Sequence, residues 1–455
     1  MLRSALLTLC LAAMLPGAVP TFSHDVAPIL YKHCASCHHS NDIAPMSLMT
    51  YQEAKPWAAA IKEAVATRKM PPWKADPHVG KWSNDPSLSA AQVATVKAWV
   101  DGGKPEGNPK DMPKMPVFQE GWHAGKPDAV FNITEVKIDG PAGSDEYRQI
   151  TVPTNFTEDR WVISAELRPG NRKVVHHAHV FVVDPPDPNA VAKPKSAPVH
   201  DPVKEFAAWT KVKSDNLLVV RPEAPVINDG CAVDDNAVFP GTVKSDLGSL
   251  LSSYLPGREP DVYPEGTARL VKAGSKLNFS IHYARSGKPE TDITSVGLIF
   301  AKEPPRTIAR RIDLSNHMFM IPAGATEHEV TECHTFQKDM LITSLTPHMH
   351  LRGKSMKMEL TYPDGHTSTV LYVPEYNFNW QITYRTADPV YLPKGTRLKI
   401  TAKFDNSKNN PTNPDPTRNI RWGEASESEM MDGWIEYIDA KSTAAPSTGA
   451  AAPHQ

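Results

Sequence analysis

Long apolar runs, basic runs and cysteine are all scarce in this chain of 455 residues. No stretch after the first twenty residues approaches the ~20 consecutive apolar residues of a transmembrane helix. The formal net charge is −2 and no basic cluster is present, which argues against a nucleic-acid partner. No glycine-rich phosphate loop and no internal repeat is visible.

Proline, by contrast, is abundant. The 43 prolines are about twice the usual share of ~5%. This density favours a loop-rich, all-β architecture over a helical one. The chain length predicts two to four domains at roughly 100–200 residues each.

The first 19 residues have the pattern of a secretory signal peptide. Arg3 supplies a positive start, residues 4–15 are apolar, and Pro16-Gly17-Ala18 is a small-residue end. We therefore expect an exported protein, periplasmic or secreted, with no integral membrane segment after cleavage. Removal of this segment takes Cys10 with it and leaves four cysteines.

Two of these four belong to a haem-attachment motif. Cys34-Ala35-Ser36-Cys37-His38 matches Cys-x-x-Cys-His, in which two thioethers hold a c-type haem and the histidine ligates its iron. A redox dithiol or half a zinc site would use similar residues, but a second cysteine pair for zinc is missing. We therefore predict one covalent haem c. Cys231 and Cys333 remain as a candidate disulfide.

Met70 is the predicted sixth ligand of the haem iron. It lies 32 residues beyond His38 and directly before Pro71. A residue before proline is pushed out of the helical region, so its side chain can turn toward the iron. Met70 could instead be a core residue at a helix end, and the alternative ligands are then His39, Met46 and His78.

Three short helices are predicted around this haem. A helical face of apolar residues leads into the motif, a second helix follows it, and a third begins with a capping box at Ser89 and Gln92 and ends at Gly102-Gly103. The residues expected on their buried faces are Val26, Ile29, Leu30 and His33; Trp57, Ile61 and Val65; and Val93, Val96 and Val100. We predict a small all-α class I cytochrome c domain over residues 20–109, followed by a linker over 110–124.

Strand patterns dominate the rest of the chain. Residues 397–404 alternate apolar and polar side chains, and so do residues 277–283, which place His282 on the polar face. Tyr362-Pro363-Asp364-Gly365 is a hairpin turn signal. One or two antiparallel sandwiches are expected here. The tail over 441–455, rich in Ala, Ser, Thr and Pro, is expected to be disordered.

Histidines cluster at three places in this strand-rich region. His348 and His350 share a strand face and can bind one ion. The adjacent His176 and His177 would point to opposite faces of a regular strand, so both can ligate only at a strand end or a bulge. Otherwise His177 and His179 form the geometric pair. His282 is the third place.

The identity of the ion is not determined by these spacings. Imidazole binds zinc, copper, iron or nickel, whereas a thioether ligand favours copper(I). Met430, in Glu429-Met430-Met431, is a candidate thioether. Paired methionines in an apolar strand are otherwise usually core residues.

These clusters together resemble the copper type II, ascorbate-dependent monooxygenases, the family of peptidylglycine alpha-hydroxylating monooxygenase and dopamine beta-hydroxylase. The resemblance covers roughly residues 125–438. It implies two tandem jelly-roll-like β-sandwiches, here 125–300 and 301–440, with two coppers facing each other across a solvent-filled cleft. It also implies the copper ligands: His176, His177 and His282 for one ion, and His348, His350 and Met430 for the other.

The sequence departs from the peptide-amidating members of the family at two positions. Thr346 stands where they have an arginine that grips the peptide carboxylate, and Trp434 stands where they have a tyrosine. A peptidylglycine substrate is therefore not expected. No cysteine follows Met430 to pair with Cys333, so the resemblance leaves Cys231 as its partner.

The predicted function is copper-dependent hydroxylation of a C–H bond of a small organic substrate by O2. The resemblance implies O2 binding at His348, His350 and Met430, with the second electron coming from the other copper. The haem would pass on electrons from a periplasmic donor, replacing or supplementing ascorbate. The alternative is a non-enzymatic electron-transfer cytochrome whose β region binds copper or docks a partner. A third interpretation is a cytochrome fused to a structural β module without a second metal.

Overall fold

The protein is described by a computed structural model. It describes residues 18–40, 44–118, 121–142, 145–186, 226, 228–232, 249–255, 260–423 and 425–440. The predicted signal peptide lies almost wholly outside these residues, and so does the predicted tail. The chain divides into two compact units. Unit 1 comprises Met1–Trp73 and Pro86–Phe118, and unit 2 comprises Lys74–Asp85 and Gln119–Gln455.

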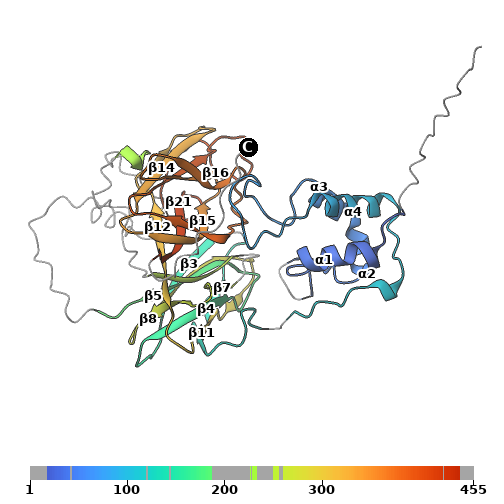
Figure 1. Cartoon of the computed structure of the whole chain (residues 1–455), viewed down its shortest axis with the longest axis horizontal. Helices are drawn as coiled ribbons and strands as arrows, with labels where there is room; N and C mark the ends of the chain where they lie inside the picture. Colours follow the sequence, from blue (N-terminus) through green and yellow to red (C-terminus); the bar gives the residue numbers. More distant parts are fainter. Residues whose placement is uncertain are drawn as a thin grey trace, which may run out of the picture. The chain divides into compact units, whose positions relative to one another are not determined.

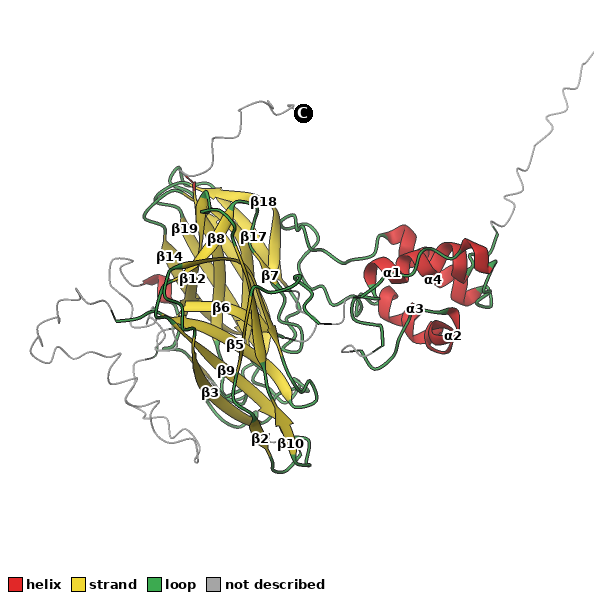
Figure 2. Ribbon diagram, turned by 90° about the horizontal axis from the view of Figure 1, so that it is seen from below, coloured by secondary structure: helices red, strands yellow, loops and turns green. Residues whose placement is uncertain are grey.

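Unit 1 contains the helices that carry the haem-attachment motif (red in Figure 2). Its elements are η1 (Phe22–Val26, a π-helix), α1 (Ala27–His33), α2 (Tyr51–Ala54), η2 (Lys55–Trp57), α3 (Ala58–Ala66), α4 (Ala90–Asp101) and η3 (Pro109–Asp111). Phe22, Leu30, Ile61 and Trp99 lie in its buried core. Among the described residues, no helix is long and apolar enough to cross a membrane.

The sequence signals for individual helices hold in part. The Ser89 hydroxyl accepts from the Gln92 N–H and the Gln92 side chain accepts from the Ser89 N–H, which confirms the predicted capping box of α4. Trp57, however, is 43% exposed rather than buried. Trp99 is fully buried instead. The expected apolar face of the second helix therefore begins one turn later, at Ile61.

The predicted fold class is wrong for this part of the chain. The protein is mostly β, its helices are short, and a small all-α cytochrome domain over 20–109 is not evident. Residues 74–85 leave the helical unit and pack with the strands of unit 2. Helix signals along the sequence do not reveal this interleaving, because it depends on a long-range strand contact.

Unit 2 contains the strands, several of which are labelled in Figure 1. They are β1 (Ala129–Asn132), β2 (Val136–Ile138), β3 (Asp145–Pro153), β4 (Arg160–Arg168), β5 (Val175–Val183), β6 (Ser249–Tyr254), β7 (Asp261–Val262), β8 (Thr267–Val271), β9 (Lys276–Ala284), β10 (Glu290–Asp292), β11 (Ser295–Phe300), β12 (Thr307–Ser315), β13 (Met320–Ile321), β14 (His328–Thr335), β15 (Met340–Met349), β16 (Gly353–Thr361), β17 (Thr367–Val373), β18 (Tyr384–Leu392), β19 (Arg397–Phe404), β20 (Ile420–Arg421) and β21 (Met431–Asp439). A short 3-10 helix, η4, covers Gly230–Ala232.

One sheet runs through both of the sandwiches that we predicted as separate domains. Its order is β1-β11-β4-β8-β12-β21-β15-β18, with β7 paired to β4. The link is a short parallel pairing in which Thr267 and Ala268 of β8 face Thr307 and Ile308 of β12. The predicted fold class of two tandem jelly-roll-like sandwiches is therefore wrong, although the sandwich content itself fits part of the unit.

Two four-stranded sheets complete the layers. They are β3-β9-β5-β6 and β14-β19-β16-β17. Leu277, Phe279 and Ile281 of β9 are fully buried in one core with Val162 and Ala165 of β4. In β19 the predicted alternation is confirmed, with every second residue buried.

Close packing between layers explains a glycine in β21. A Cβ on Gly433 would lie 2.1 Å from Cδ1 of Ile400 in β19. A larger residue there would require the Ile400 side chain to move. Gly433 therefore lets β21 lie directly against the second sheet.

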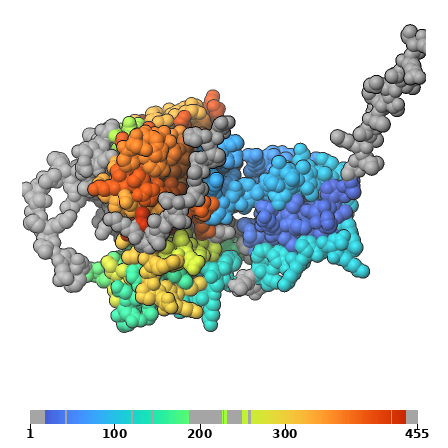
Figure 3. Space-filling model, in the orientation of Figure 1, coloured from blue at the N-terminus to red at the C-terminus, as the bar shows by residue number. Residues whose placement is uncertain are grey.

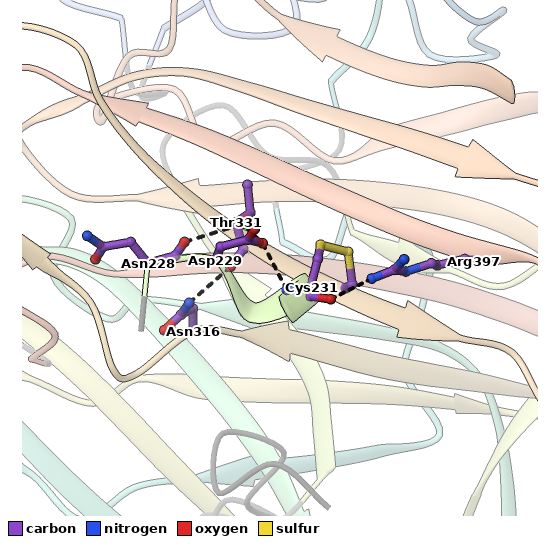
Figure 4. The surroundings of a disulfide bond; sticks show 7 residues. Asn228, Asp229, Cys231, Asn316, Thr331 and Arg397 are labelled. Carbon is purple, nitrogen blue, oxygen red and sulfur yellow. Dashed lines mark hydrogen bonds between the residues drawn. A yellow bond between two sulfur atoms is a disulfide. The ribbon is translucent and has the colours of Figure 1, made fainter. Parts of the chain in front are cut away.

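The candidate disulfide is present. The Cα atoms of Cys231 and Cys333 are 5.0 Å apart, within the usual range for a disulfide. Figure 4 shows how neighbouring polar contacts hold the Cys231 segment: Asp229 accepts from the Cys231 N–H at 3.0 Å and from the Thr331 hydroxyl at 2.7 Å. Arg397 donates to the Cys231 carbonyl at 3.0 Å. The bond ties η4 to β14.

Candidate metal centre

The first site is formed by His176, His177 and His282. Their Nδ1 atoms lie 3.3 to 3.4 Å from one another, and these three residues form a group that could hold a metal ion. A point equidistant from three atoms at this spacing is about 1.9 Å from each, close to the ~2.0–2.1 Å of a zinc–imidazole bond. We call this group the three-histidine site.

A bulge in β5 allows two adjacent histidines to serve one site. Val175 pairs with Tyr283, but His177 pairs with His282, so the register against β9 shifts at His176. The extra residue turns the His176 side chain to the same side as His177. His179 is not part of the group, and its Nδ1 lies 2.8 Å from the Ser253 hydroxyl.

Burial keeps the His177 imidazole of this site neutral. His177 and His282 are buried, and desolvation, with repulsion from the neighbouring histidines, holds the pKa of His177 well below its usual value. The Tyr147 ring stacks on His282 with centroids 4.2 Å apart. A neutral imidazole is the form that ligates a metal.

The second site is formed by His348 and His350 at the end of β15. Their ring centroids are 5.3 Å apart, and both residues are buried. Desolvation lowers the pKa of His348 to about 4 and holds the pKa of His350 well below its usual value. We call this pair, with Met430 as its candidate third ligand, the two-histidine site.

In the two-histidine site, Nδ1 of each ring faces an oxygen acceptor. Nδ1 of His348 lies 2.6 Å from Oε1 of Gln381, and Nδ1 of His350 lies 3.3 Å from the Ser428 carbonyl. An N–H donated to each oxygen leaves Nε2 unprotonated. The nitrogen of His348 available to a metal is therefore Nε2, whereas the Nδ1 atoms converge in the three-histidine site.

The register of β15 with β21 runs toward His350 and Met430. His348 pairs with Asp432 and Met349 with Met431, and one further step, just beyond both strands, would set His350 opposite Met430. Paired residues lie on the same face of a sheet. Glu429 shapes this turn, because its carboxylate accepts from the backbone N–H groups of His350 at 2.8 Å and Arg352 at 2.6 Å.

One aromatic ring, that of Phe378, contacts both sites. The centroid of the Phe378 ring lies 5.6 Å from that of His176 and 5.8 Å from that of His350. The centroids of these two histidine rings are therefore at most 11.4 Å apart. Trp434 stacks on His348 at 5.0 Å and meets His179 edge-on at 5.7 Å. The five predicted histidine ligands thus come together in unit 2, with Phe378 in contact with both groups.

In unit 1 the haem-motif residues lie at the C-terminal end of α1. The His38 N–H donates to the Cys34 carbonyl at 2.9 Å, and neither Cys34 nor Cys37 is in a disulfide. Nδ1 of His38 lies 3.2 Å from the Met46 carbonyl, which leaves Nε2 for an iron. Burial lowers the pKa of His38.

The four candidates for the sixth iron ligand differ in their burial, their contacts and the unit to which they belong. Met70 is half-buried after α3. His39 stacks on Phe118 with centroids 4.0 Å apart, and Met46 supports His38. His78 belongs to unit 2, so it is not part of the helical unit that carries the motif.

Several residues of the centre were not recognised from the sequence. Gln381, Phe378 and Tyr376 come from the segment between β17 and β18, which has no periodic pattern. The Tyr376 hydroxyl donates to the Met349 carbonyl at 2.7 Å and accepts from its N–H at 3.0 Å. The density of aromatic and amide side chains in this segment was the only available signal.

Comparisons with known proteins add little. No protein-family model matches the chain, and no curated protein matches it. Among solved structures it is similar to the major capsid protein P2 of bacteriophage PM2, with 12% identity over 68% of this chain and 97% of that chain. The TM-score of 0.25 is too low for this likeness to bear on fold or function.

Proposed function

We propose that the chain is a copper-dependent monooxygenase that hydroxylates a C–H bond of a small organic substrate with O2. The observation that carries this proposal is the presence of two different histidine groups, three Nδ1 atoms within 3.4 Å of one another in one and two buried imidazoles in the other. One oxygen atom would enter the substrate and the other would leave as water, with two electrons and two protons consumed.

The donor sets fit copper. Imidazole suits copper, and a thioether favours its cuprous state. His176, His177 and His282 would hold one ion, and His348, His350 and Met430 the other. Bound copper would supply the O2 binding and one-electron steps that the side chains lack.

The remaining residues orient and shield these ligands. Gln381 holds the His348 ring so that Nε2 faces the ion, and Glu429 holds the backbone at His350. Burial of both histidines excludes water. Exclusion of water strengthens electrostatic interactions in the site and limits side reactions.

The two departures from the peptide-amidating enzymes favour a substrate without a peptide carboxylate. The Thr346 hydroxyl is buried and lies 2.8 Å from the Thr383 hydroxyl. Trp434 stacks between His348 and the guanidinium of Arg311. Neither side chain offers the bidentate cation that grips a carboxylate.

The haem would supply electrons to the two copper sites. Cys34 and Cys37 would bind it covalently, and His38 and Met70 would ligate the iron. Electrons would come from a periplasmic donor through this haem, which would replace or supplement ascorbate. The exported location that this requires follows from the predicted signal peptide.

Metal analysis and one substitution test the proposal. We expect one iron and two coppers per chain, and Met430→Ile should abolish O2 consumption while haem reduction is unchanged. Met431→Ile is the matched control, because Met431 is a buried neighbour on the opposite face of β21. Iron alone would favour the structural β module. Copper that does not react with O2 in the reduced protein would favour the electron-transfer alternative.

A further inference from the structure

Residues 74–85, which we call the strap, belong to unit 2 although helical segments of unit 1 flank them. The strap pairs with β18, the last strand of the nine-stranded sheet. Trp82 forms an antiparallel bridge with Thr386, and the Ser83 N–H donates to the Arg385 carbonyl at 2.9 Å. In Figures 1 and 3 this blue segment runs beside the orange-red strands of the C-terminal part.

Asn84 makes the most specific contact of the strap. Its Nδ2 donates to the Thr383 carbonyl at 2.8 Å, and its Oδ1 accepts from the Arg385 N–H at 3.0 Å. The single amide therefore satisfies two backbone groups on the outer edge of β18. Trp82 packs beside it on the buried ring of Tyr384, with centroids 5.4 Å apart.

The strand that Asn84 holds is in register with the two-histidine site. Ser344 pairs with Arg385 and Leu345 with Tyr384. The same register, continued, sets Thr346 opposite Thr383 and His348 opposite Gln381. The side chains agree with it, since the two threonine hydroxyls lie 2.8 Å apart and Gln381 Oε1 lies 2.6 Å from His348 Nδ1.

We propose that Asn84 is a positioning residue for the two-histidine site, acting through Thr383 and Gln381. An edge strand that loses its cover can fray or slip in register. Either change would move Gln381 away from His348 and release the preference for Nε2 as the ligating atom. The strap, which lies between the candidate iron ligand Met70 and α4 in sequence, thus completes a metal site of the strand unit. This inference rests on the proposed metal binding at His348 and His350.

The test is a titration of the full-length apoprotein with Cu(I) against a competing chelator. Gln381→Leu should weaken the two-histidine site about 10–100-fold, as is typical when a supporting partner of a ligand is lost. Asn84→Ala should weaken it by a smaller factor, about threefold to tenfold, and should speed amide hydrogen exchange at residues 381–385. The three-histidine site should bind Cu(I) with the same affinity as in the unmodified chain.

Two further variants distinguish a specific effect of Asn84 from a general loss of structure. Ser83→Ala is the matched control on the strap, because its hydroxyl makes only one 3.4 Å contact, and it should leave both sites unchanged. Asn84→Asp keeps the acceptor for the Arg385 N–H and should recover part of the lost affinity. If Asn84→Ala binds Cu(I) at both sites like the unmodified chain, the positioning role is overturned.

Failure of the proposed function gives a different result. If His348→Ala combined with His350→Ala leaves the Cu(I) stoichiometry of the chain unchanged, no metal binds at that site. Both the proposed function and the role of Asn84 then fall together. If the stoichiometry drops by one and Asn84→Ala has no effect, only the role of Asn84 falls.

Discussion

The two histidine sites bring their imidazoles together by different structural means. The three-histidine site is assembled by backbone geometry, because the bulge in β5 brings two adjacent histidines beside His282 on the neighbouring strand. The two-histidine site uses regular strand alternation and depends on side chains outside the strand for its ring orientation. A bulge is a local feature of one strand pair. The two-histidine site, in contrast, requires the correct register of several strands.

This difference predicts which site is more sensitive to distant substitutions. The three-histidine site should respond mainly to changes in its own ligands. The two-histidine site should also respond to changes in Gln381 and in the residues that fix its strand. The predictions below test this contrast.

The largest effect is expected from His177→Ala. His177 is buried and its ring contacts those of His176 and His282. His179, the other histidine in contact with it, is hydrogen-bonded to Ser253. Loss of a ligand should cost at least about a hundredfold in Cu(I) affinity, more than the ~10–100-fold typical of a supporting residue. Chelator competition measures it. Substantial Cu(I) binding in this variant would show that His179 can replace the lost ligand.

The same variant sharpens the contrast through its specificity. The Cu(I) affinity of the two-histidine site should stay within about twofold of the unmodified chain, because His177 makes no backbone contribution to β15. A parallel loss at both sites would mean that the two groups form one cooperative unit rather than two separately assembled sites.

The second prediction concerns pH. Burial lowers the pKa of His348 to about 4, below the ~6.5 of an unfolded histidine. The unfolded chain therefore binds more protons than the folded one between these values, and acid favours unfolding. The metal-free protein should lose stability as pH falls through 6.5, on the order of 3 kcal/mol by pH 4 at ~1.4 kcal/mol per pKa unit.

Denaturant unfolding at pH 7 and pH 5 measures this loss. His348→Gln should reduce the pH dependence, because the titrating group is removed. His366→Gln is the matched control, since His366 lies on the exposed turn between β16 and β17. An equal pH dependence in the unmodified chain and in His348→Gln would contradict the buried neutral imidazole.

Local sequence patterns predicted the parts of this centre that depend on one strand. The alternation of residues 397–404 is that of β19, and the rings of His348 and His350 lie 5.3 Å apart, as their spacing on one strand face predicts. For His176 and His177 the sequence indicated only a condition, a bulge or a strand end. Which of these applied depended on the pairing of β5 with β9, which no local pattern specifies.

Long-range contacts explain what the sequence did not reveal. The pairing of β8 with β12 involves only two residue pairs, yet it joins the two predicted sandwiches into one sheet. In sequence the strap resembles a loop of the helical unit. Only its contacts with Thr383 and Arg385 show that it belongs to the strands of unit 2. Gln381 has no signal of its own, because its role comes entirely from the register of β15 and β18.

A smaller effect, shared by both sites, is expected from Phe378→Leu. This ring contacts His176 in one site and His350 in the other. An aromatic pair contributes about 0.5–1.5 kcal/mol beyond burial, so Cu(I) affinity should fall about twofold to tenfold at each site. Trp380→Leu, two residues along the same segment, is the comparison variant. A loss of Cu(I) affinity confined to the two-histidine site would show that Phe378 supports His350 but not His176.

The smallest effect is expected from Arg311→Met. The Arg311 guanidinium lies 4.4 Å from the Trp434 ring, whose other contacts include the stacked His348. Loss of this cation–π contact should lower the free energy of unfolding by about 1 kcal/mol. Its positive charge also helps to lower the pKa of His348, so the variant should release metal from the two-histidine site at a slightly higher pH.

Arg310→Met is the matched control for this charge effect. Arg310 precedes Arg311 on β12, and its side chain is 43% exposed and pairs with Asp439 rather than with Trp434. An exposed ion pair of this kind contributes little to stability. The pH at which the two-histidine site releases Cu(I) should therefore shift in Arg311→Met alone, and the three-histidine site should not respond to either change. A shift of equal size in both variants would mean that net charge, and not the stack of Arg311 on Trp434, sets the protonation of His348.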